Sequence, residues 1–390
     1  MHQASSIGGG SYCLLNIIKV IDREKFEPVV ALLSEGPLAD EIRNLGVEVV
    51  IFQRMAAIPY NRSLLQRGSL KAYWDIRKSI PALKNLLTEK HIDVLYLNNM
   101  MLCRYLQPAK ECGCKTVVHV REHWPLNEHK QQLEWARQCI YNFADKMIAI
   151  NNYSARMFPK KEATIIYDWI DMEGRYKPIP MSDIIGEDCS SKKVLLFTGG
   201  QSYIKGTDYI LEAFSKYVKG DEYRLLLLGG DSVISFKGWR ALVKKLLEMA
   251  GRVGFSKRVE DLIKSDYRIK SVPAIFELSH IIEQSYCFVS YFRIPHANLG
   301  LAENIILGNP CVAAKTEESL EYTNNGEYAL LVEPNNIGEF GIQLQGFLRD
   351  IERWKNAAEV GSKHLSEMFM PAKNIRILNK VLDTFLVAYV

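Results

Sequence analysis

The chain has 390 residues, of which 48% are hydrophobic and 24% are charged, a composition typical of globular proteins that excludes a disordered or fibrous chain. At this length we expect two domains rather than one. The formal net charge of +4 is too small to indicate a nucleic-acid partner, and no apolar run approaches the ~20 residues that cross a bilayer.

Short apolar runs alternate along the chain with longer amphipathic stretches. The apolar runs predict strands at residues 27–33, 47–52, 93–99, 115–120, 145–150, 163–167, 192–200, 223–231, 286–292, 310–314 and 329–333. Helical patterns lie between them, for example at residues 11–22, 69–87, 206–218, 277–284 and 337–354. Because such alternation indicates parallel sheets covered by helices on both sides, we predict an α/β fold with two doubly wound, Rossmann-like domains facing a central cleft.

The predicted linker is residues 177–193, which hold two prolines and few apolar positions. Residues 1–178 would form the first domain and residues 191–370 the second. A final amphipathic helix, residues 371–390, is expected to cross back and pack on the first domain. A doubly wound domain places a buried strand before its first glycine loop, yet only six residues precede Ile7. The first strand therefore looks missing, and we expect an apolar run of about five or six residues to be encoded upstream.

A candidate anion site lies in LLFTGGQSYIKGTDYILEAF, which runs from a strand through a loop into a helix. Gly199 and Gly200 would let the backbone approach a ligand, and the helix start offers free N–H groups. Lys205 directly precedes the helix and would add a full positive charge. The order of a P-loop is absent, and a solvated lysine beside a tight turn is the alternative.

Glu303 lies within LGLAENIILG, an otherwise apolar helical stretch. A carboxylate is seldom kept in such surroundings without a partner. If the helix begins near Leu299, its amino end could hold phosphate oxygens. Glu303, one turn later, would then accept hydrogen bonds from two adjacent sugar hydroxyls. An exposed glutamate on an end helix is the alternative.

The lysine loop and the Glu303 helix belong to a series of four motifs. In chain order these are GG-x4-KG, LLLLGGD, LGLAENIILGNPCVA and ESLEYTNNGEYALLVEPNN. The order resembles the donor half of the GT-B glycosyltransferases, and more narrowly the retaining family 4, also called group 1, over about residues 194–336. In the first half, SIGGGSYCLLNIIKVID resembles the family's first glycine loop and helix. The resemblance implies that the first domain is the acceptor side and that the second binds a nucleotide sugar.

The resemblance also implies site residues. Lys205 would bind the diphosphate, and Glu303 the ribose hydroxyls of the donor. Glu321 matches an acidic residue of the family's closing segment. Backbone groups of the remaining donor-site candidates would approach the phosphates or the sugar: Gly8, Gly9, Gly10, Gly199, Gly200, Asn298, Leu299 and Gly300. A flexible tail is the alternative for the first three glycines.

Two positions depart from the family pattern. A glutamate that touches the donor sugar is replaced here by Pro295, and an arginine opposite the diphosphate by Gly200. His296 or Asn298 could take over the hydrogen bonds of the missing glutamate.

A substitute for the missing arginine could come from VVHVREHWP. Alternation along a strand places His119 and Arg121 on one face, with Arg121 nearer the carboxyl end. The family carries a histidine near this point, for which His119, Arg121 and His123 are the candidate equivalents. A histidine satisfied within the core is the alternative.

Two further stretches have weaker interpretations. Gly229, Gly230 and Asp231 end a strand, where they could border the nucleotide base or form a plain turn. Between Arg54 and Lys90 there are eight basic and two acidic residues, interleaved with aromatic and leucine side chains. This segment suits a peripheral contact with anionic lipid, and a solvated basic helix is the alternative.

Together these features predict a glycosyltransferase that moves a sugar, with retention, from a nucleotide diphosphate sugar to a lipid-linked or saccharide acceptor, in surface polysaccharide or glycoconjugate synthesis. Lys205, His119 and Arg121 are the predicted catalytic residues. No metal or cofactor beyond the donor is expected, because no Asp-x-Asp pair stands where a metal-dependent transferase needs one. Eight scattered cysteines favour plain thiols and a cytoplasmic location, peripheral on the inner face of the membrane. An epimerase of the same fold and a silent nucleotide-sugar-binding subunit are the alternatives.

Overall fold

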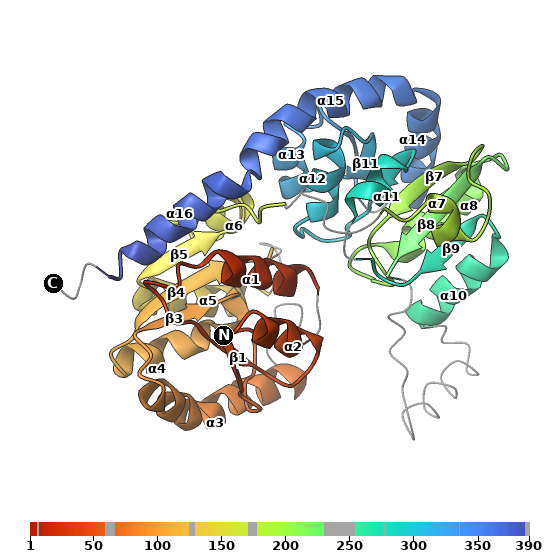
Figure 1. Cartoon of the computed structure of the whole chain (residues 1–390). Helices are drawn as coiled ribbons and strands as arrows, with labels where there is room; N and C mark the ends of the chain where they lie inside the picture. Colours follow the sequence, from red (N-terminus) through yellow and green to blue (C-terminus); the bar gives the residue numbers. More distant parts are fainter. Residues whose placement is uncertain are drawn as a thin grey trace. The chain divides into compact units, whose positions relative to one another are not determined.

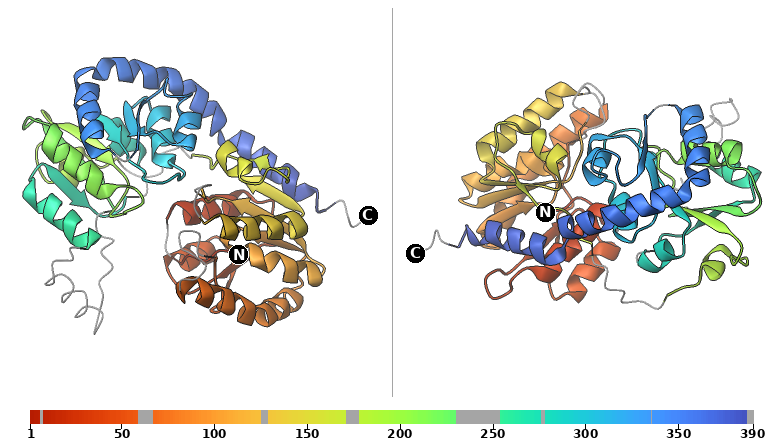
Figure 2. Two further views of the ribbon diagram at one scale, coloured as in Figure 1. Left: turned by 180° about the vertical axis from the view of Figure 1, so that it is seen from behind. Right: turned by 90° about the horizontal axis from the view of Figure 1, so that it is seen from above.

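The computed structural model describes residues 1–5, 8–58, 67–124, 129–170, 178–229, 254–275, 278–334 and 336–386. The chain divides into two compact units, Met1–Trp169 with Phe369–Val390, and Ile170–Met368. Red to yellow ribbons and the blue C-terminal helix mark the first unit in Figures 1 and 2, and green to blue ribbons mark the second. Every strand pair described is parallel, as the α/β prediction requires.

The first unit contains a strand pair and a four-stranded sheet. The pair is β1 (Val29–Leu32) with β2 (Glu48–Ile51), and the sheet has the order β3 (Val94–Leu97), β4 (Lys115–Val120), β5 (Lys146–Ala149), β6 (Thr164–Ile165). Its helices are α1 (Gly9–Val20), α2 (Pro37–Asn44), α3 (Arg67–Glu89), η1 (Met100–Tyr105), α4 (Leu106–Glu111), α5 (Lys130–Phe143) and α6 (Asn152–Arg156). The N–H of His2 donates to Ala31 (3.0 Å), and the N–H of Asn98 to Met1 (3.1 Å), so the first residues hydrogen-bond to both sheets.

The last helix, α16 (Pro371–Asp383), belongs to the first unit. Its residues Leu378, Val381 and Leu382 are buried in one cluster with side chains of α1, β4 and β5. The side chain of Asn374 accepts a hydrogen bond from the N–H of Tyr167 (3.0 Å). In the views of Figures 1 and 2, α16 lies along β5. The chain therefore returns to the first unit after the second is complete.

The second unit is built on one six-stranded sheet with the strand order β12-β11-β10-β7-β8-β9. Its strands are β7 (Lys193–Phe197), β8 (Tyr223–Leu228), β9 (Ile269–Val272), β10 (Cys287–Val289), β11 (Cys311–Ala314) and β12 (Leu330–Val332). Its helices are α7 (Met181–Ile185), α8 (Thr207–Tyr217), α10 (Phe255–Ser265), α11 (Ser279–Glu283), α12 (Leu299–Ile306), α13 (Glu317–Tyr322), α14 (Ile337–Arg349) and α15 (Ile351–Met368). β7 and β10 lie side by side near the middle, which brings the loops after them together.

Three of the differences from the sequence predictions lie in the second unit. β9 was not predicted, because Lys270 and Ser271 interrupt its apolar pattern at the sheet edge. Residues 337–354 form not one helix but the end-to-end pair α14 and α15, which Asp350 separates. The predicted linker holds α7 and packs on the second unit, where the N–H of Met181 donates to the side chain of Gln284 (2.8 Å). None of the helices described is long and apolar enough to cross a membrane.

Candidate functional site

The loop after β7 is fixed by short contacts to its neighbours. Gly200 has a left-handed backbone (φ 59°), and its N–H donates to Leu228 (3.0 Å). The Thr207 hydroxyl donates to the carbonyl of Gly200 (2.6 Å). Gly206 is also left-handed (φ 64°), and a Cβ there would lie 2.2 Å from the carbonyl oxygen of Tyr291. Since a side chain at Gly206 would push this loop away from β10, glycine is required to place Lys205.

The Lys205 ammonium has no hydrogen-bond acceptor or acidic partner within the described ranges, although the side chain is half-buried. Burial lowers the pKa of this lysine. Burial, and then the charge of Lys205, lower the pKa of His296 to about 4, so the imidazole is neutral at pH 7 and lies close to the lysine. A half-buried cation without a counter-ion suits an anionic ligand.

Arg293, which follows β10, ties its own loop to the lysine loop. Its N–H donates to the carbonyl of Ile204 (2.9 Å), and its guanidinium pairs with Asp208 (2.7 Å). The guanidinium carbon lies 4.0 Å from the ring centroids of both Tyr203 and Tyr209. Sequence reasoning missed this residue. The only sequence signal was a basic residue directly after a buried strand.

The helix α12 begins where the sequence placed it. The side chain of Asn298 caps it, accepting from the N–H of Leu301 (3.2 Å) and donating to the Ser290 hydroxyl (2.9 Å). The N–H groups of Leu299 and Gly300 stand in the first turn, which has no intrahelical acceptors. A Cβ on Gly300 would lie 2.8 Å from the Thr198 hydroxyl, so the helix start packs closely against the end of β7. This packing brings the two predicted anion-binding segments together.

Glu303 lies one turn into α12 and is half-buried. Its carboxyl group has no hydrogen-bond or ionic partner within the part of the chain that the structure describes. Burial alone raises its pKa to about 7. The side chain is therefore poised between its neutral and charged forms at physiological pH, and a ligand with hydroxyl groups would favour the charged form.

Glu318 on α13 was not predicted from the sequence. It is fully buried, and one carboxyl oxygen accepts from the N–H of His296, whereas the other has no partner. Burial raises its pKa to about 8. A cavity of about 300 Å³ lies beside it at the ends of β10, β11 and β12, lined in part by Pro295, Thr316 and Glu317. Glu318 thus braces the loop that carries His296 and Pro295.

Glu318→Gln is expected to stabilise the protein at pH 8 by on the order of 3 kcal/mol, measured as a higher melting temperature. The carboxyl pKa rises from 4.5 to about 8 on folding, so the folded state binds more protons and stability falls as pH rises through that interval. The amide keeps the acceptor for His296 and cannot ionise.

At about pH 5 the stability difference between this variant and the wild type should nearly vanish. At that pH the Glu318 carboxyl of the wild type gains few protons on folding. Glu317→Gln, at the exposed neighbouring position, is the control and should change stability little at either pH. An equal melting temperature for wild type and Glu318→Gln at pH 8 would show that the buried carboxyl carries no such cost.

In the first unit, His119 and Arg121 are buried and partnered. The Arg121 guanidinium pairs with Asp168, and its Nε donates to the side chain of Asn98 (3.0 Å). His119 Nδ1 contacts the Tyr96 hydroxyl (2.6 Å) and the Arg121 guanidinium (3.2 Å). Burial, and then the charge of Arg121, lower the pKa of His119 well below its usual range. The charge of Arg121 is therefore already balanced within this unit.

The remaining predicted residues are placed as follows. Gly9 and Gly10 open α1 after Gly8, and a Cβ on Gly8 or Gly9 would meet nothing within 4 Å. His123 is buried and lies 3.2 Å from the Asn151 side-chain oxygen. Glu321 is half-buried on α13. Gly230 and Asp231 lie outside the described residues.

No family model and no curated protein matches the sequence. Solved structures match almost the whole chain. HepE from Anabaena in complex with UDP-glucose is 18% identical, with a TM-score of 0.72 and 98% of both chains covered. The fold is that of the GT-B glycosyltransferases.

Two other solved structures support the same fold. A glycosyltransferase from Rickettsia africae is 14% identical, with a TM-score of 0.71 over 99% of this chain and 97% of its own. Sucrose-phosphate synthase from Thermosynechococcus elongatus is also 14% identical, with a TM-score of 0.70 over 99% and 95%. At these identities the likeness concerns the fold, which confirms the predicted α/β class.

Proposed function

We propose that the protein is a glycosyltransferase that uses a nucleotide diphosphate sugar as donor. The proposal rests on two unpartnered side chains in the second unit. Within the described residues, Lys205 has no counter-ion and Glu303 has no hydrogen-bond partner. On the helix that carries Glu303, the first turn of α12 offers free N–H groups. The cation and the free amides suit a diphosphate, and the carboxylate suits the hydroxyl groups of a ribose. The complex of HepE with UDP-glucose supports this choice of donor.

The proposed reaction proceeds with retention, as in family 4. The acceptor hydroxyl would attack from the side of the leaving diphosphate, whose oxygen helps to remove the proton. Lys205 and the α12 amides would stabilise the charge that develops on the diphosphate as the glycosidic bond breaks. His296 is neutral, so it would hydrogen-bond the donor without adding charge. The acceptor is proposed to be lipid-linked or a saccharide.

Release of nucleoside diphosphate tests the function. Purified protein with UDP-glucose and a bacterial acceptor extract should release UDP faster than protein with UDP-glucose alone, and proton NMR of the product should show the anomeric configuration of the donor. Conversion of the donor sugar without acceptor would favour an epimerase instead. Tight UDP-glucose binding with no turnover under any condition would favour a silent binding subunit. Pro295 and Gly200, which depart from the family pattern, are the sequence features that favour this alternative.

We further propose that α3 makes a peripheral contact with anionic membranes. Leu70 and Trp74 are each 56% exposed, and Arg77 and Lys78 on the same helix are also exposed. The Lys78 ammonium lies 5.0 Å from the centroid of the Trp74 ring. Exposed aromatic and basic side chains on one amphipathic helix favour the headgroup region of a bilayer. Loss of vesicle binding in Trp74→Ala and at high salt is the expected result.

A further inference from the structure

A second polar cavity lies in the first unit, outside the elements that carry the proposed donor site. It encloses about 320 Å³ between η1 and α5. Its lining is basic, aromatic and amide in character, without a carboxylate: Arg104, Trp135, Gln138, Cys139, Asn142 and Phe143. A cavity of this lining would attract an anion rather than repel it.

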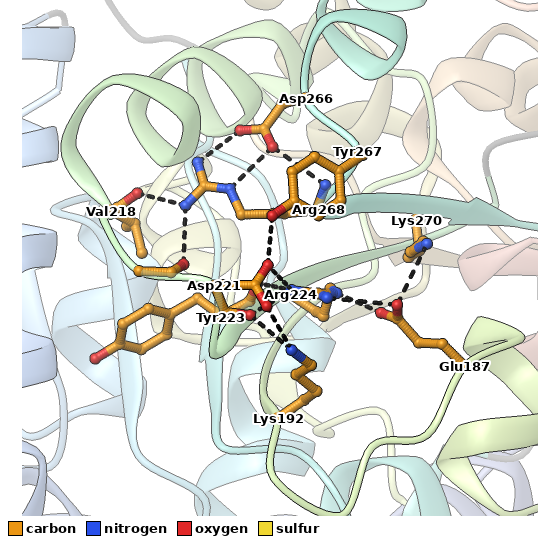
Figure 3. A network of polar contacts seen from close by, with 11 residues as sticks. Glu187, Lys192, Val218, Asp221, Tyr223, Arg224, Asp266, Tyr267, Arg268 and Lys270 are labelled. Carbon is orange, nitrogen blue, oxygen red and sulfur yellow. Dashed lines mark hydrogen bonds and ion pairs between the residues drawn. The ribbon is translucent and has the colours of Figure 1, made fainter.

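Arg104 is half-buried and differs from four other buried or half-buried arginines in the described part of the chain. Arg121, Arg224, Arg268 and Arg293 each pair with a carboxylate. Figure 3 shows two of these pairs, Arg224 with Glu187 and Arg268 with Asp266. Within the described ranges Arg104 has no acidic partner, and its Nε is buried without an acceptor. Its guanidinium is therefore the unbalanced charge of this group.

Two aromatic rings fix the orientation of Arg104. Its guanidinium carbon lies 5.7 Å from the centroid of Tyr73 and 5.8 Å from that of Trp135, and the two rings meet edge to face at 5.7 Å. Contacts with ring faces hold a guanidinium while leaving its N–H fork free. Such a fork binds two oxygens of a phosphate at once. The Asn142 amide could supply a further hydrogen bond to a phosphate oxygen, whereas the Gln138 amide already donates to Glu134 (2.7 Å).

The surroundings indicate the source of the phosphate. Trp135 lines the cavity, is 39% exposed and contacts Tyr73 of α3. The next residue, Trp74, and Leu70 one turn earlier are the exposed apolar side chains of that helix. An anion bound by Arg104 would thus sit beside side chains that favour the boundary between headgroups and acyl chains.

We propose that this cavity binds the phosphate group of an anionic phospholipid. The inference rests on the membrane contact of α3 proposed above and adds to it a defined headgroup site. Attraction of exposed basic residues to an anionic membrane depends on their charge alone. Phosphate binding by Arg104 depends in addition on the planar shape of its guanidinium.

The test is co-sedimentation with phosphatidylcholine vesicles that contain a minority of phosphatidylglycerol, at physiological ionic strength. Arg104→Ala and Arg104→Lys should both weaken binding about ten- to a hundredfold, because lysine keeps the charge but loses the two-pronged contact. Arg77→Ala should cost only about fivefold, as one basic residue near a charged surface does. Lys363→Ala, which removes an exposed charge from the second unit, is the control and should bind as wild type does.

Equal vesicle binding by wild type and Arg104→Lys would overturn the proposal. A second outcome would also overturn it: inorganic phosphate stabilises the wild type but not Arg104→Ala, while the two proteins bind vesicles equally. That result would indicate a site for free phosphate. UDP-glucose binding is measured on the same variants by their melting temperatures. If UDP-glucose still raises the melting temperature of the variants, they are folded and bind the donor. A loss of vesicle binding in them then concerns the headgroup site and not the proposed function.

Discussion

Lys205→Ala is expected to lower turnover roughly 100- to 1,000-fold, the effect of about 3–4 kcal/mol of lost charge stabilisation. Its ammonium has no counter-ion within the described part of the chain, and burial makes its positive charge more effective than in water. Negative charge on the diphosphate grows as the glycosidic bond breaks, so the loss should fall on kcat more than on donor KM. UDP release under saturating donor measures it.

Lys264→Ala is the matched control for this experiment. Lys264 is an exposed lysine of α10 in the same unit, so its removal changes the net charge equally and should leave turnover unchanged. A normal kcat for Lys205→Ala would place the lysine away from the leaving group. A loss shared equally by both variants would indicate a general charge effect.

Glu303→Gln is expected to raise donor KM about ten- to a hundredfold with a smaller drop in kcat. The amide keeps the shape but loses the charge, and a hydrogen bond to a charged group contributes about 1.5–3 kcal/mol. The ribose is remote from the breaking bond, so the contact should be similar in the ground and transition states. Steady-state kinetics with varied donor measures the change, and Glu283→Gln, an exposed glutamate of α11, is the control.

The pH dependence of donor KM provides a second readout for Glu303. Its carboxyl has a pKa of about 7, and the charged form accepts both ribose hydroxyls. Donor affinity should therefore fall as pH drops below 7, by up to about tenfold per unit, and Glu303→Gln should abolish this slope. A wild-type slope that persists in the variant would assign the titration to another group.

The sequence alone indicated the strands of all three described sheets except β9. Interior strands such as β7 and β11 are apolar on both faces because helices cover both sides, and this pattern is visible in a single sequence. β9 lies at the sheet edge, where Lys270 and Ser271 remain compatible with solvent, so its pattern resembles a loop. The division of residues 337–354 at Asp350 was also invisible, because both helices keep the same apolar period.

For the candidate site, the sequence determined which residues were out of place, and the tertiary structure decided which of them have partners. Lys205 and Glu303 stood out locally, as a lysine before a helix and a carboxylate among apolar residues. Arg121 stood out in the same way, but Asp168, far along the chain, neutralises it. Glu318 and Arg104 carried no local signal, and only the fold buries one against His296 and sets the other beside Tyr73 and Trp135. Charge pairing and desolvation depend on neighbours that are distant in sequence, so a local pattern predicts the candidates while only the fold identifies the unpaired ones.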